Sequence, residues 1–126
     1  MPATIVALVE DLFFLAKIQE TAKAVGVRVV TGNARGGSNA IAEAQPQAIF
    51  LDLNSRGLPA VDCIRALKAD PATRPIRIVG FVSHVQEELI ATARAAGCDV
   101  VMARSAFTQQ LPSLLGSLVT EGEEKS

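Results

Sequence analysis

The sequence is poor in the residues that build several common kinds of site. Its 126 residues include no tryptophan or tyrosine, one histidine and two cysteines. With so few histidine and cysteine side chains, a zinc site with the usual four ligands is not expected. The cysteines, Cys63 and Cys98, are not in a CxxC arrangement, so we expect reduced thiols and a cytoplasmic protein.

Long apolar runs and blocks of one charge are also absent. No apolar segment approaches the roughly 20 residues of a membrane span, and no charged segment followed by an apolar one opens the chain. The 12 basic and 13 acidic residues are spread along the sequence. We therefore expect binding neither to membranes nor to nucleic acids. The length predicts one domain, and its core must be aliphatic, with five phenylalanines as the only aromatic residues.

Short apolar segments alternate with amphipathic ones along the chain. The segment ATIVALV at 3–9 is continuous and rich in β-branched residues, as in strands buried on both faces. Strands are predicted at 3–9, 27–31, 49–53, 76–82 and 99–103, and helices at 11–25, 36–45, 58–69, 86–96 and 106–118. This alternation predicts an α/β fold, a five-stranded parallel sheet with helices on both faces.

The C-terminal segment contains one conflict. Pro112 lies inside the last predicted helix, where proline removes a hydrogen bond, so we expect the helix proper to begin near Leu111. Residues 120–126 are polar and are predicted to form a disordered tail after a domain at 1–119. The apolar residues of the last strand and helix leave open a homodimer through that face.

Polar residues follow the strands at the edge where parallel sheets bind ligands. Glu10 and Asp11 follow the first strand, Asp52 and Asn54 end the third, and Arg104 follows the fifth. If the first and third strands are neighbours, three carboxylates meet, and such a cluster suits Mg²⁺. A carboxylate cluster with a metal and a fixed cation is what phosphoryl transfer to a carboxylate requires.

Four segments occur in an order and spacing that resembles the response-regulator receiver domain of two-component signalling. They are the acidic pair at 10–11, LDLN at 51–54, IRALKADPATRPIRIVGF at 64–81 and AAGCDVVMARSAF at 95–107. The resemblance covers about residues 3–118. It implies a flavodoxin-like doubly wound fold with strand order 2-1-3-4-5.

The resemblance also implies roles for individual residues. Asp52 matches the phosphoacceptor, and Mg²⁺ would be held by Asp11, Asp52 and the backbone carbonyl of Asn54, with Glu10 as a further contact. Arg104 falls on the position of the family's lysine. The phosphodonor would be a histidine kinase or a phosphotransfer protein. The chain would not be an enzyme beyond catalysing its own phosphorylation and dephosphorylation.

Several positions depart from the family pattern. The hydroxyl that bonds the phosphoryl group falls on Val82, the switching aromatic residue on Val101, and the proline after the lysine on Ser105. Ser83 has a hydroxyl, but strand alternation should turn it away from the site unless a bulge intervenes. Binding and phosphorylation can survive these changes, whereas the usual switch is not expected to.

Simpler interpretations stay open for the same residues. Asp11 is either a helix cap alone or a cap and a ligand, and Glu10 is either a solvated acid or a metal contact. Arg104 either senses a phosphoryl group or forms a permanent ion pair with Asp52. One of the two phenylalanines at 13–14 should face the core, which leaves Phe13 as a candidate contact for a partner.

The sequence as a whole predicts a stand-alone response regulator. It would accept a phosphoryl group on Asp52 with Mg²⁺ and would signal by contact with a downstream protein. The alternative is a pseudo-receiver, an interaction module that works without phosphorylation. The joint changes at Val82, Val101, Arg104 and Ser105 favour that alternative.

Overall fold

The computed structural model describes residues 3–31, 37–54, 59–83 and 86–125, in which strands and helices alternate. The elements are β1 (Thr4–Leu8), α1 (Leu12–Val25), β2 (Arg28–Thr31), α2 (Gly37–Ala44), β3 (Ala48–Asp52), α3 (Ala60–Ala69), β4 (Arg77–Val82), α4 (Glu87–Ala96), β5 (Val100–Ala103) and α5 (Arg104–Lys125). No helix in these ranges is long and apolar enough to span a membrane.

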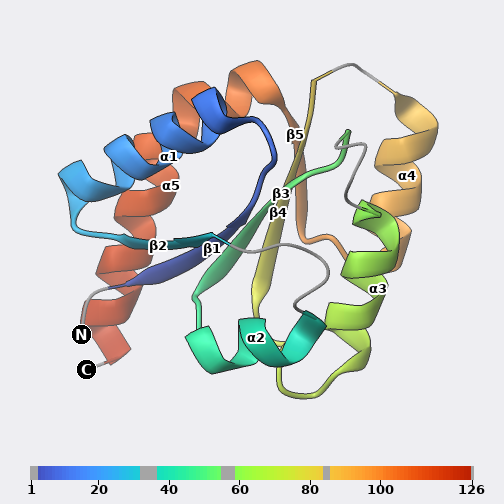
Figure 1. Ribbon diagram of the computed structural model, residues 1–126, viewed down its shortest axis with the longest axis horizontal. Coiled ribbons are helices and arrows are strands. Elements are labelled where there is room, and N and C mark those ends of the chain that lie inside the picture. The colour runs from blue at the N-terminus through green and yellow to red at the C-terminus, as the bar shows by residue number, and fades with distance from the viewer. Residues whose placement is uncertain (1–2, 32–36, 55–58, 84–85, 126) are drawn as a thin grey trace.

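The strands form one parallel sheet in the order β2-β1-β3-β4-β5. Helices α1 and α5 lie side by side on one face, and α2, α3 and α4 cover the other (Figure 1). The predicted fold class and strand order are therefore confirmed. Because β1 and β3 are neighbours, the residues that follow them meet at the carboxyl edge of the sheet.

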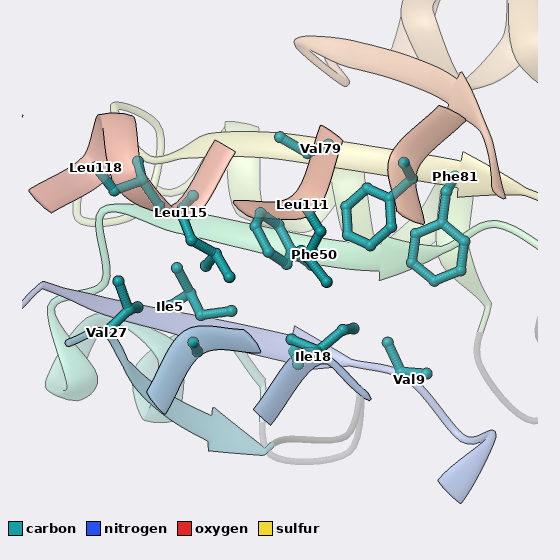
Figure 2. Close-up of a cluster of buried hydrophobic side chains, with 14 of the residues drawn as sticks. Ile5, Val9, Ile18, Val27, Phe50, Val79, Phe81, Leu111, Leu115 and Leu118 are labelled. Atoms are coloured by element: carbon teal, nitrogen blue, oxygen red, sulfur yellow. The ribbon is translucent and has the colours of Figure 1, made fainter. Parts of the chain in front are cut away.

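Strand alternation divides the buried side chains between two clusters. The α1/α5-side cluster includes Ile5, Phe14, Ile18, Phe50, Val79, Phe81, Phe107, Leu111, Leu115 and Leu118 (Figure 2). The α3/α4-side cluster includes Val6, Leu8, Ile41, Ile49, Leu51, Leu53, Ile64, Leu67, Ile78, Val82 and Cys98. A residue's place in a strand thus decides which helices its side chain meets.

Four of the five phenylalanines meet in the α1/α5-side cluster. Phe107 lies 4.8 Å from Phe81, 5.1 Å from Phe50 and 5.8 Å from Phe14, measured between ring centroids. The rings of Phe14 and Phe81 are 4.9 Å apart. These contacts join α1, α5 and the central strands directly beneath the carboxyl edge of the sheet.

Helix α5 differs from the prediction at both ends. It begins at Arg104 rather than near Leu111, it contains Pro112, and it continues through residues 120–125, which were expected to be disordered. Phe107, Leu111, Leu115 and Leu118 are all buried at helical spacing. Burying each such side chain contributes roughly 1.5–3 kcal/mol, and together they outweigh the cost of about 3 kcal/mol for an interior proline.

Candidate functional site at the carboxyl edge of the sheet

Asp52 ends β3 as a nearly buried carboxylate. Its side chain is on the face of the sheet that carries Phe50, and the residue is 8% exposed. One oxygen, Oδ1, accepts a hydrogen bond from the backbone N–H of Asn54 at 2.9 Å. Burial raises the pKa of Asp52; the Asn54 N–H and the charge of Arg104 oppose this, while the charges of Asp11 and Glu10 add to it. Among the described residues this one N–H bond is little compensation for burying a charge, a pattern typical of functional carboxylates.

Asp11 caps the N-terminus of α1, as predicted. Its Oδ1 accepts hydrogen bonds from the backbone N–H groups of Phe13 at 3.0 Å and Phe14 at 3.2 Å. Its Oδ2 accepts a hydrogen bond from Nη2 of Arg104 at 2.9 Å. The Arg104 bond is the main cause, followed by the Phe14 N–H, of a pKa for Asp11 below its usual value. The carboxylate therefore has three N–H donors already in place.

Arg104 forms its ion pair with Asp11, and not with Asp52 as one interpretation of the sequence proposed. Its guanidinium carbon lies 4.2 Å from the centroid of the Phe14 ring. Arg104 starts α5, and Phe14 lies in the first turn of α1, so the packing of these helices brings the groups together. Arg104 still lowers the pKa of Asp52 through its charge.

In the observed arrangement, Arg104 holds the oxygen of Asp11 that a divalent cation would use. Asp11 is occupied by two amides and a guanidinium, and Glu10 is exposed. Within the described part of the chain, no three His, Cys, Asp or Glu side chains form a set that could hold a metal ion. The ligand set of Asp11, Asp52, Glu10 and the carbonyl of Asn54 stays a prediction.

The side chain of Asn54 has a role that sequence reasoning missed. Its Oδ1 accepts a hydrogen bond from the backbone N–H of Ser83 at 2.6 Å, and its Nδ2 donates to Oε1 of Gln86 at 3.3 Å. Asn54 thereby ties the end of β3 to the end of β4 and to the residue before α4. The only sequence signal was an asparagine just after a buried strand, where such residues commonly bond to nearby backbone.

Val82 lies on the opposite face of the sheet from Asp52. The register of β3 and β4 pairs Asp52 with Phe81, and paired residues point to the same face. Val82 packs instead in the α3/α4-side cluster. The structure therefore does not support a pocket-facing Val82. Continued alternation would put the exposed Ser83 on the side of Phe81, contrary to the expectation that it turns away.

The remaining predicted positions lie around this edge. Val101 is half-buried against the α3/α4-side cluster, and Ser105 is exposed in the first turn of α5. Phe13 is 92% exposed while Phe14 is buried, as the sequence indicated. Leu12, beside Phe13, is 76% exposed, so two large apolar side chains face solvent at the start of α1.

Comparisons with known proteins agree with this architecture. No family model matches the sequence. The chain is 32% identical over 122 residues to protein-glutamate methylesterase/protein-glutamine glutaminase 5 of Myxococcus xanthus (strain DK1622), a match that covers 92% of this chain and 35% of that protein. The chain thus spans about a third of the length of this relative.

Solved structures give the clearest likeness. A response regulator receiver domain from Rhodospirillum rubrum superposes with a TM-score of 0.76 at 18% identity, covering 91% of this chain and 92% of that one. The Mn²⁺-bound form of response regulator Rcp1 gives a TM-score of 0.69 at 15% identity, covering 93% and 91%. The resemblance seen in the sequence is confirmed at the level of structure: the chain has the fold of response-regulator receiver domains.

Proposed function

We propose that this chain is a receiver module of two-component signalling and that Asp52 accepts the phosphoryl group. The observation that carries the proposal is the nearly buried carboxylate at the tip of β3, next to Asp11 and Arg104 in a receiver fold. Burial raises the pKa of Asp52 and so makes its oxygens more basic than those of a solvated carboxylate. The donor would be a phosphohistidine of a histidine kinase or phosphotransfer protein.

The transfer is an in-line displacement at phosphorus. An Asp52 oxygen forms a bond to phosphorus as the P–N bond to histidine breaks, and the bonding electron pair goes to the imidazole nitrogen, which takes a proton from solvent. The product is an acyl phosphate on Asp52. The chain supplies the acceptor and the surrounding charges, and the signal would pass by protein–protein contact, with exposed Leu12 and Phe13 as candidate contacts.

A divalent cation completes this proposal. The Mn²⁺-bound Rcp1 structure shares the fold, and a hard cation such as Mg²⁺ prefers carboxylate and carbonyl oxygens. Asp52, Asp11 and the backbone carbonyl of Asn54 are the ligands we propose. In the observed arrangement Arg104 occupies Asp11, so binding to both carboxylates requires that ion pair to open.

The proposal is tested by labelling with a small phosphodonor. Acetyl phosphate and Mg²⁺ should add one phosphoryl group to the wild-type chain, measured by intact mass spectrometry, and Asp52→Asn should abolish the addition. Asp62→Asn removes a carboxylate from an exposed position on α3 and should leave labelling unchanged. Undiminished labelling of the Asp52→Asn variant would refute the assignment.

A phosphorylation-independent interaction module is the second candidate function. It is favoured by the Arg104–Asp11 ion pair and by the apolar Phe81 side chain, which lies beside Asp52 in the strand register. Beryllofluoride with Mg²⁺ mimics a phosphoryl group and distinguishes the two candidates. Changes in thermal stability or amide spectra support the first candidate, and unchanged behaviour supports the second.

A further inference from the structure

Arg104 is held at the start of α5 by two interactions at once. Its guanidinium donates to Asp11, and the same group lies over the Phe14 ring. That ring is itself fixed, because Phe14 is 5% exposed and contacts the rings of Phe81 and Phe107. A planar guanidinium over an aromatic face is a favourable arrangement, and here it is pre-organised by the aromatic core.

A metal ion at Asp11 would meet this guanidinium directly. Oδ1 of Asp11 is directed at the first turn of α1, so Oδ2 is the oxygen left to coordinate, and Arg104 donates to it at 2.9 Å. A dication bound to Oδ2 would lie within a few ångströms of a fixed positive charge. Such a contact is strongly repulsive unless the arginine moves away.

We propose that Arg104 and a divalent cation are mutually exclusive partners of Asp11. Metal binding then breaks both the ion pair and the contact with Phe14, which are the interactions that fasten the first residue of α5 to the first turn of α1. Arg104 thereby sets a threshold of cation concentration below which Asp11 stays paired with Arg104. This inference rests on the proposed function, because it concerns the cation of the same site.

The experiment is a Mg²⁺ titration of the full chain, followed by backbone amide NMR at the start of α1. We expect Arg104→Gln to bind Mg²⁺ about tenfold more tightly than the wild type, the combined effect of a half-buried ion pair and a cation–π contact. Arg104→Lys keeps the charge without the flat guanidinium and should fall between the two. Arg77→Gln is the control. Arg77 begins β4, at the end of the sheet away from the site, so this variant loses the same charge and should bind Mg²⁺ as the wild type does.

Each outcome of the titration either supports or overturns the mutual exclusion of Arg104 and the cation. If Arg104→Gln binds Mg²⁺ no more tightly than the wild type, including the case in which neither binds, the exclusion is overturned. Adding Asp11→Asn to Arg104→Gln should remove the gain, and a gain that persists would also overturn it. If Arg104→Gln fails to give a folded amide spectrum, the test is made with Arg104→Lys. Tighter Mg²⁺ binding by Arg104→Lys than by the wild type then supports the mutual exclusion of Arg104 and the cation, and unchanged binding overturns it.

Labelling with acetyl phosphate tests the proposed function independently of this titration. Suppose that acetyl phosphate labels wild-type Asp52 but Arg104→Gln shows no gain in Mg²⁺ affinity. That result overturns only the mutual exclusion of Arg104 and the cation. A gain in affinity without any labelling overturns the phosphoryl acceptor and leaves the exclusion supported.

Discussion

Replacing Val82 with threonine tests which face of β4 borders the site. Val82 is 3% exposed in a cluster of aliphatic side chains and Cys98. The substitution exchanges a buried methyl group, worth about 0.8 kcal/mol, for a hydroxyl whose desolvation without a partner costs about 1–3 kcal/mol. We therefore expect a loss of roughly 2–3 kcal/mol in the free energy of unfolding, a large share of the stability of a small domain.

Urea unfolding followed by circular dichroism measures this loss. The midpoint should fall by about 1 M or more, with little change in slope. Val30→Thr is the matched control, because Val30 is half-buried on the edge strand β2, where a hydroxyl can reach water; its cost should stay below about 1 kcal/mol. Binding of beryllofluoride to Val82→Thr should not improve.

The opposite result would refute this placement of Val82. A valine facing Asp52 at the open edge of the sheet would accept the hydroxyl at little cost. The new hydroxyl would then strengthen binding of the phosphoryl analogue by a hydrogen bond to a charged group, worth about 1.5–3 kcal/mol. Unchanged stability with tighter analogue binding would mean that Val82, and not Phe81, borders the site.

Three further predictions concern the core, a helix end and the ion pair. Phe107→Ala should lower the free energy of unfolding by about 3–5 kcal/mol in denaturant titrations, because a fully buried ring with three aromatic neighbours is removed. Gly97→Ala should cost about 1–2 kcal/mol, since Gly97 has φ of 116° and a Cβ there would approach Cγ of Lys68 to 2.7 Å; a melting temperature equal to the wild type would contradict this. The pKa of Asp11 in the folded protein is lowered below its usual value of 3.8, so its ionised form stabilises the fold above that pH. This stabilisation is lost as the pH falls through the folded-state pKa. Asp11→Asn should therefore lower the melting temperature at pH 7 and match the wild type in strong acid.

The fold could be predicted because its signals are local. Continuous β-branched runs and helical spacing depend only on neighbouring residues, and parallel connectivity follows from their alternation. The path of α5 could not be read in the same way. Pro112 is a strong local signal against a helix, and only tertiary burial of the residues around it shows that the signal is overruled.

The sequence predicted which charged residues meet at the carboxyl edge of the sheet, but not which of them form an ion pair. The sequence places Asp11, Asp52 and Arg104 at one edge because each follows a parallel strand. Which carboxylate receives the arginine depends on how α1 packs against α5, and no spacing in the sequence records that. The role of Phe81 was in principle accessible, because the register of β4 against β3 decides which of two successive residues faces Asp52.

The departure at Arg104 is the one that the structure explains most fully. A lysine in this position could pair with Asp11, but its ammonium is a compact point charge without the flat face that covers the Phe14 ring. Arginine binds the carboxylate and the ring together, and so holds Asp11 more firmly than lysine would. Asp52 keeps its raised pKa and its place at the tip of β3, because Arg104 acts on it only through its charge. An acceptor role for Asp52 is therefore compatible with the Arg104–Asp11 ion pair, and under our proposal the cation concentration needed to displace Arg104 would decide whether the site can respond.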